Sequence, residues 1–227
     1  MRILAGRKLR PVRRTDIILC LLFALTSSAV TAQDLDFPDY RSKKDNFSKI
    51  SDKDIRGDVA SFALAGVDES IGKAPLNSVP VKEVTGNSMT FDDGNIQVTI
   101  RTGVFFPSKH KMMYVDKHLL RIDNHPYYGG TYGMAPQVTI ESITVVVGKD
   151  KDTVVIPPTA YNDLYDPQFS FNQGGSTRSR NGVFLSNDKH TFYIYMLNIN
   201  SGGSEFTWVI RDKQYLRRVV DFGFLSK

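Results

Sequence analysis

The seven residues NIQVTIR, at positions 95–101, decide the fold class because their apolar and polar side chains alternate without exception. Alternate side chains point to opposite sides of an extended chain, so the three apolar residues of this stretch share one face. A period of two predicts a β-strand that is buried on one side. The preceding residues 92–95, Asp-Asp-Gly-Asn, predict a hairpin turn that joins this strand to another one at 88–91.

The same alternation continues toward the C-terminus, with one change of parity. Val138 and Ile140 lie on one face of their predicted strand, whereas Ile143 and Val145 lie on the other. A slip of one residue near Glu141-Ser142 predicts either a β-bulge or a strand that crosses between two sheets. In residues 192–197 both faces are apolar, which predicts a central strand that is covered on both sides.

Two further segments carry specific expectations. Residues 111–123 fit a hairpin that turns at Asp116-Lys117, but their apolar spacing fits a helix as well, and the strand interpretation is preferred. On the last predicted strand, Arg217 and Arg218 point to opposite faces, and the inward one needs a carboxylate partner because an unpaired buried charge is very costly.

These patterns predict an all-β protein, built as an antiparallel β-sandwich of about nine or ten strands, with a closed β-barrel as the alternative. The strands are short and are separated by turn residues. The predicted domain organisation is a signal peptide at 1–32, a flexible polar leader at 33–57 and a single β-sandwich domain at 58–227.

The first 32 residues have the composition of a secretory signal. Six basic residues precede an apolar run at 17–25, which is too short to span a bilayer, and small residues lead up to Ala32. Cleavage near Ala32 predicts export, either to the periplasm or to the medium. No second apolar run of that kind follows, so the mature chain is expected to have no transmembrane segment.

Removal of this segment changes the charge balance and the available chemistry. The chain has 29 basic and 24 acidic residues, and removing six basic residues and Asp16 leaves 23 of each. A balanced chain gives no reason to expect a nucleic-acid partner. The only cysteine, Cys20, is removed as well, which excludes disulfides, zinc-thiolate sites and a cysteine nucleophile from the mature protein.

The stretch HPYYGGTYGMAPQ, at 125–137, is the first candidate binding segment. Tyr127, Tyr128 and Tyr132 combine large apolar faces with polar tips and would suit stacking against a sugar ring or a peptide. The neighbouring glycines would let the backbone approach a ligand closely. The alternative is that the tyrosines cover one end of the fold and the glycines only permit the turn.

A second candidate segment is the polar loop QFSFNQGGSTRSRNG at 168–182. Arg178 and Arg180 could meet a phosphate or a carboxylate there, with backbone N–H groups of the paired glycines beside them. The alternative is a mobile loop with no ligand, since long loops are either functional or flexible.

The sequence offers no pattern typical of catalysis, and no catalytic residue, metal ligand or cofactor is predicted. The four histidines form no zinc-binding spacing, and no nucleophile-elbow motif is present. Asn162, Asp163 and Asp166 could offer oxygens to calcium, but the glycine and the glutamate of a calcium loop are missing, so a packed structural corner is preferred.

Two segments, IPPTAYNDLYDP at 156–167 and FTWVIRDKQYLRRVVDFGF at 206–224, resemble stretches of uncharacterised bacterial exported all-β proteins. The resemblance implies a shared architecture and carries no functional residue. The function predicted from the sequence is therefore an exported, non-catalytic binding or interaction module for an unknown ligand, either a carbohydrate or a protein. An envelope structural or assembly component and an exported hydrolase are the alternatives.

Overall fold

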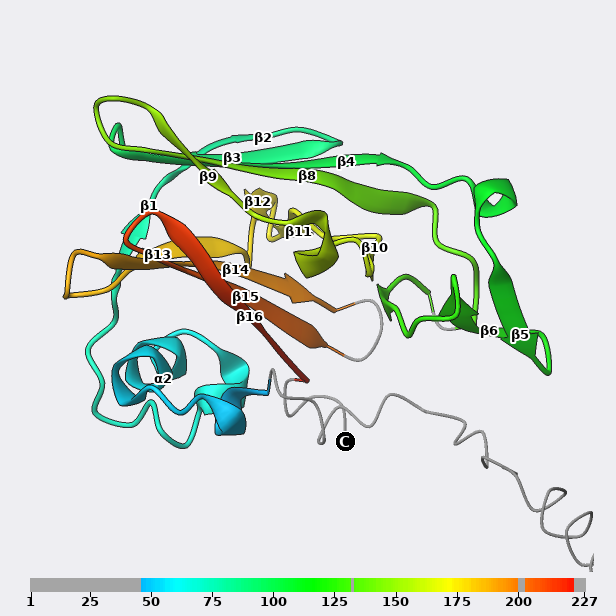
Figure 1. The fold of residues 1–227 in the computed structure, drawn as a ribbon, viewed down its shortest axis with the longest axis horizontal. Helices are drawn as coiled ribbons and strands as arrows, with labels where there is room; N and C mark the ends of the chain where they lie inside the picture. The colour runs from blue at the N-terminus through cyan, green and yellow to red at the C-terminus, as the bar shows by residue number, and fades with distance from the viewer. Residues whose placement is uncertain (1–45, 132, 200–202, 223–227) are drawn as a thin grey trace, which may run out of the picture. The chain divides into compact units, whose positions relative to one another are not determined.

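The computed structural model describes residues 46–131, 133–199 and 203–222, and all of these belong to one compact unit. They form mainly β-strands, arranged in two large sheets and two separate hairpins, together with one short α-helix (Figure 1). The predicted signal segment, residues 1–32, lies outside the described residues. Within the described ranges, no helix has both the length and the apolar character that crossing a membrane requires.

The first large sheet has five strands, and four of them follow one another along the chain. Their order across the sheet is β1-β13-β14-β15-β16, and every pairing is antiparallel. The strands are β1 (Asn77–Val79), β13 (Gly182–Leu185), β14 (Thr191–Asn198), β15 (Ser204–Arg211) and β16 (Gln214–Phe222). As predicted, β14 occupies the centre of its sheet and is buried on both faces.

The second large sheet has the order β2-β3-β4-β8-β10-β7, and one more strand, β9, pairs with β8. Its pairings are antiparallel except for the short parallel contact between β10 and β7. The strands are β2 (Val81–Val84), β3 (Ser88–Asp92), β4 (Ile96–Val104), β7 (Tyr128–Gly129), β8 (Val138–Val147), β9 (Asp152–Val155) and β10 (Leu164–Tyr165). The predicted hairpin at 88–101 is confirmed as β3 and β4.

The change of parity in β8 is confirmed as a β-bulge. Arg101 pairs with Ser142 and the next residue, Thr102, pairs with Ile140, so Glu141 is the extra residue. One extra residue on a strand moves all later side chains to the opposite face. For this reason Ile140 and Ile143 both reach the same core although their spacing is odd.

The segment with an ambiguous period, 111–123, is a hairpin of β5 (Met112–Val115) and β6 (His118–Ile122). Asp116 and Lys117 form its two-residue turn with φ values of 47° and 67°. Positive φ at both central residues is the conformation that matches the twist of the flanking strands. The second separate hairpin joins β11 (Phe171–Gln173) to β12 (Ser176–Arg178).

The main hydrophobic core lies between the two large sheets, where side chains from both inner faces meet. Phe206, Trp208 and Ile210 share the inner face of β15, as their alternation predicts, and all three are fully buried. From the other sheet, the strands β3, β4 and β8 contribute Met89, Phe91, Val98, Ile100 and Val145. The described chain has sixteen strands instead of nine or ten, because several pairings of two or three residues have no recognisable period.

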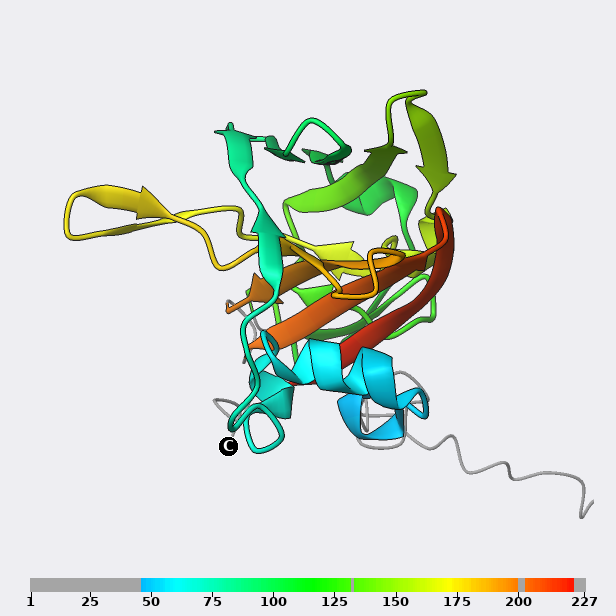
Figure 2. The same cartoon turned by 90° about the vertical axis from the view of Figure 1, so that its left-hand side faces the viewer.

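A helical cap covers the outer face of the five-stranded sheet (Figures 1 and 2). It consists of the 3₁₀ turn η1 (Phe47–Lys49), the helix α2 (Lys53–Ala60) and the 3₁₀ turn η2 (Leu64–Gly66). Its buried side chains pack against the outward residues of β14, which are Tyr193, Tyr195 and Leu197. Two further 3₁₀ turns, η3 (Pro107–Lys109) and η4 (Pro158–Ala160), lie in connections of the second sheet.

The cap includes residues on both sides of the predicted domain boundary. The boundary predicted between residues 57 and 58 falls inside α2. Phe47, Ile50 and Ile55, which belong to the predicted polar leader, are buried in the cluster that joins the cap to the sheet. Ile55 and Val59 are four residues apart and form the buried face of α2, whereas Phe47 and Ile50 anchor the preceding 3₁₀ turn.

One acidic side chain, Glu205 of β15, is enclosed beneath the cap. Only 2% of Glu205 is exposed, and one carboxylate oxygen accepts a hydrogen bond of 3.2 Å from the Ala65 amide. The other oxygen, Oε1, has no hydrogen-bond partner among the residues that the structure describes. Burial raises the pKa of Glu205 to about 7, and the negative charge of Asp221 on the adjacent strand adds to this effect.

This environment predicts that acidification stabilises the fold through Glu205. The folded-state pKa lies above the ordinary value of 4.5, so the contribution is fully present below pH 4.5 and is lost as the pH rises through about 7. We therefore compare the effect of Glu205→Gln on the free energy of unfolding at two pH values. The substitution should be about 2 kcal/mol more stabilising at pH 8 than at pH 5. Urea unfolding at both pH values measures this difference, and an equal effect of the substitution at both would contradict it.

Candidate functional site

A cavity lies at one end of the two large sheets, where turns from both of them meet. It has a volume of about 810 Å³ and is called the loop-end cavity here. The turns that reach it follow β3, β8, β13 and β15, and the β8–β9 and β13–β14 turns are at the same end of the layers in Figure 1. Ligand pockets commonly have volumes of about 300–1,000 Å³, so this cavity is large enough for a small molecule.

The floor of the loop-end cavity is apolar. Ile96 and Val147 come from the seven-stranded sheet, and Leu185 and Phe192 come from the five-stranded sheet. Ile96 and Phe192 are buried in the main core, whereas Val147 and Leu185 are half-buried and pack against it. The cavity therefore opens between the sheets directly onto the edge of the hydrophobic core.

The rim of the cavity is polar and charged. His190 and Asp212 face each other across neighbouring turns, with 3.2 Å between Nδ1 and the carboxylate. Lys213 makes an ion pair of 2.6 Å with Asp152. Lys189 also lines the cavity, and its side chain has no hydrogen-bond or ion-pair partner among the described residues. An apolar floor with a few charged groups at the mouth is the usual composition of a small-molecule site.

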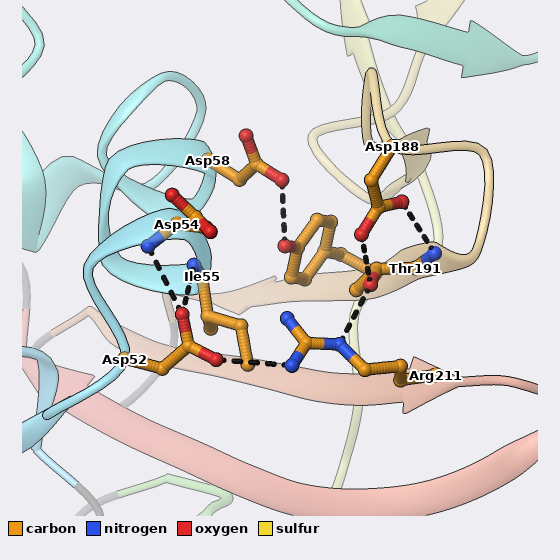
Figure 3. Close-up of polar contacts among 8 residues, drawn as sticks. Asp52, Asp54, Ile55, Asp58, Asp188, Thr191 and Arg211 are labelled. Carbon is orange, nitrogen blue, oxygen red and sulfur yellow. Dashed lines mark hydrogen bonds and ion pairs between the residues drawn. The ribbon is translucent and has the colours of Figure 1, made fainter.

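The turn that forms one wall of the cavity, residues 186–190, is held in place by a chain of polar contacts (Figure 3). Asp188 accepts hydrogen bonds from the Thr191 amide and from the Thr191 hydroxyl, both at 2.7 Å. Arg211 donates to the same hydroxyl at 3.0 Å and to Asp52 at 3.0 Å. The wall of the cavity is thereby connected to the start of α2.

The two carboxylates among these contacts, Asp52 and Asp188, are stabilised in their charged form. The Ile55 amide, followed by the Arg211 guanidinium, holds the pKa of Asp52 below its ordinary value. Burial of Asp188 would raise its pKa, but hydrogen bonds from the hydroxyl and amide of Thr191 outweigh burial and leave the pKa lowered. Asp52 also caps α2, because its carboxylate accepts hydrogen bonds from the amides of Asp54 and Ile55 (Figure 3).

The structure separates the tyrosines of the first candidate segment. Tyr128 is 2% exposed, and its ring packs in the main core at 5.5 Å from the ring of Phe206. Tyr127 is half-buried and donates a hydrogen bond to the Leu119 carbonyl. Tyr132 lies outside the described residues. Tyr128 therefore has no exposed face for stacking, and the proposed contact of Tyr127 and Tyr132 with a ligand stays a prediction.

The glycines of the same segment have a structural role. Gly129 has a φ of 91° and pairs with Tyr165 in the parallel contact of β7 and β10. A Cβ atom at this position would overlap the carbonyl oxygen of Tyr165, and the Asn198 side chain would lie 2.7 Å from it. Glycine here allows two backbones to approach each other, rather than a backbone and a ligand.

The second candidate segment, 168–182, lies away from the loop-end cavity. Its hairpin of β11 and β12 projects from the sheets in Figure 2. The Arg180 guanidinium lies 4.5 Å from the ring centroid of Phe171, and Arg178 lies within 3.5 Å of the Gln173 side chain. Both arginines are exposed, and their role as contacts for an acidic group stays a prediction.

The acidic residues of the corner at 162–166 have structural partners within the protein. Asp163 forms a two-pronged ion pair with Arg218, and one of its two contacts measures 2.9 Å. Asp166 accepts hydrogen bonds from the amides of Gln137 and Val138 at 2.9 and 2.7 Å. The predicted carboxylate partner of the inward arginine is thus Asp163. No group of three or more potential metal ligands occurs in the part of the chain that the structure describes.

A smaller cavity of about 400 Å³ joins this corner to the first candidate segment. Asp123, His125 and Asp163 line it, together with Tyr165, whose pKa is raised to about 12 by burial and then by the two aspartates. The His110 side chain, followed by the Lys111 amide, holds the pKa of Asp123 below its ordinary value. Asp123 is already hydrogen-bonded to His110 and Asp163 is paired with Arg218, which favours a structural role for both.

The sequence predicts the turn at 92–95 but not its meeting with the other turns that line the loop-end cavity. Their convergence depends on the order of the strands, which the pattern of a single strand does not contain. Searches among models of protein families, curated proteins and solved structures found no match, so the function is argued from the geometry.

Proposed function

We propose that this protein is an exported β-sandwich that binds a small molecule in the loop-end cavity. One observation carries the proposal: a cavity of about 810 Å³ has an apolar floor between the sheets and charged groups at its mouth. Such a site removes the apolar part of a ligand from water while the polar rim selects its orientation. The basic and apolar composition of residues 1–32 supports export.

The position of the cavity supports this assignment over the two other candidate segments. Turns from both sheets form its walls, and a rigid scaffold of strands that holds variable loops is a common arrangement of binding sites. The wall at 186–190 is fixed by the Asp188, Thr191 and Arg211 contacts before any ligand arrives. Preorganisation of this kind lowers the entropy cost of binding.

A neutral fluorescent probe, N-phenyl-1-naphthylamine, tests the proposal without depending on charge. We expect saturable binding of one probe per chain, and we expect Leu185→Trp to weaken it at least about tenfold because the indole fills the floor. Leu216→Trp is the matched control, since Leu216 is 51% exposed and does not line the cavity. Absence of saturable binding, or equal binding by the two variants, would reject the proposal.

Both variants need to be folded for this comparison. Far-ultraviolet circular dichroism and the midpoint of urea unfolding provide that check. If Leu185→Trp fails to fold, Leu185→Phe replaces it, because this change adds less volume at the same half-buried position.

A further inference from the structure

We infer that the ligand of the loop-end cavity is a single-chain amphiphile with an acidic head group, and this inference rests on the binding function proposed above. The cavity combines an apolar floor with one cationic side chain at its mouth that has no partner within the described part of the chain. A ligand that matches both features has a hydrocarbon part and a carboxylate or a similar anion at one end.

The apolar part of the ligand follows from the floor. Val147 and Leu185 are half-buried and lie on opposite sheets, so they present hydrocarbon from two sides. Behind them, Ile96 and Phe192 belong to the main core and carry no group that could satisfy a polar atom. A polar group placed against this floor would lose its hydrogen bonds to water without replacement.

The charge of the head group follows from how the ionic groups at the mouth are paired. Asp212 faces His190, and Asp152 faces Lys213, so each carboxylate already has a cationic or hydrogen-bonding neighbour. The Lys189 ammonium is the remaining charged group of the lining and has no partner among the described residues. A cationic head group would meet only occupied carboxylates, whereas an anionic one would meet Lys189.

The conformation of the turn at 186–190 fixes the position of the Lys189 backbone. Its φ is 61°, and its amide donates to the Ser186 carbonyl at 3.2 Å. The next amide, of His190, donates to the Asp188 carboxylate at 2.7 Å. Hydrogen bonds within the turn therefore hold the backbone at 186–190, and the Lys189 side chain extends from a defined point on the rim.

Competition against N-phenyl-1-naphthylamine with three ten-carbon compounds tests the head group. We expect decanoate to displace the probe about three- to fivefold more tightly than decanol, which is the contribution of one exposed ion pair, and decylamine to bind most weakly. Raising the salt concentration should reduce the advantage of decanoate because the pair is screened. All three are used below the concentrations at which they form micelles.

Lys189→Met is the decisive variant, since it keeps a long apolar side chain and removes the charge. It should bring decanoate and decanol within about twofold of each other while probe binding remains. Lys117→Met, in the remote β5–β6 turn, is the matched control and should change nothing. Equal binding of decanoate and decanol by the parent protein, or a preference that survives Lys189→Met, overturns the inference.

These outcomes are distinguishable from a failure of the binding function itself. If the neutral probe does not bind, the proposed function fails first and the head-group comparison is not reached. If the probe binds and decanol competes as well as decanoate, only the acidic head group is wrong. Sedimentation of the protein with vesicles of an anionic phospholipid, dependent on Lys189, would assign the lysine to a membrane surface and would overturn the single-chain ligand.

Discussion

Arg218→Ala is expected to lower the free energy of unfolding by about 3–5 kcal/mol, because it removes one partner of a buried ion pair. The Arg218 side chain is only 12% exposed, and its guanidinium contacts both oxygens of Asp163. It also donates to the Ala160 carbonyl, which accepts a second hydrogen bond from the Trp208 indole. Without Arg218, the charge of Asp163 stays partly buried with no opposite charge beside it.

Urea unfolding followed by the fluorescence of Trp208, the only tryptophan of the chain, measures this loss. The double variant Arg218→Ala, Asp163→Ala should be less destabilised than the sum of the two single variants, since neither charge is then left alone. Lys213→Ala is the control for an exposed pair and should cost less than about 1 kcal/mol. A loss below about 1 kcal/mol for Arg218→Ala would show that the pair contributes little.

Gly129→Ala is expected to destabilise the protein by about 4 kcal/mol, from two causes that add. A non-glycine residue at a φ of 91° is strained by about 1–3 kcal/mol. In addition, the new Cβ would overlap the carbonyl oxygen of Tyr165, which is backbone and can move only if the pairing of β7 with β10 is broken. Overpacking against fixed atoms costs a further 1–3 kcal/mol or so.

Gly94→Ala separates these two causes. Gly94 has nearly the same φ, 88°, but no atom lies within 4 Å of the position that its Cβ would take. Its substitution should therefore show only the conformational cost. The difference between the two variants in urea unfolding reports the close approach of β7 to β10, and equal losses would mean that the overlap is relieved without cost.

Those elements of the fold that depend on neighbours in sequence could be predicted, because a period of two is a local property. The hairpin at 88–101, the bulge at Glu141 and the central position of β14 all follow from the alternation of apolar residues. The requirement that an inward arginine have a carboxylate partner also follows from local pattern and elementary electrostatics. Its identity as Asp163 does not, since that residue belongs to a distant corner.

The candidate site was much less predictable, because it depends on contacts between residues that are distant in sequence. Tyr127 and Tyr128 are adjacent in an extended segment, so their side chains point to opposite sides, and a core position for one of them excludes a shared surface. The loop-end cavity is formed by turns that are distant in sequence, and their meeting depends on strand order. The burial of Phe47 and Ile55 likewise depends on contact with a sheet face, which no local sequence pattern predicts.

The pairing of β1 with β13 has a consequence for how the chain reaches this fold during biosynthesis. Asn77 faces Leu185, and the helical cap packs against strands of the same sheet, β13 among them, so β1 and the cap find their neighbours in the late part of the described chain. Contacts between such distant positions form slowly, because a long loop must close first. In a nascent chain that ends before β13, β1 and the helical cap lack their native partners, and this delay would serve the export proposed above.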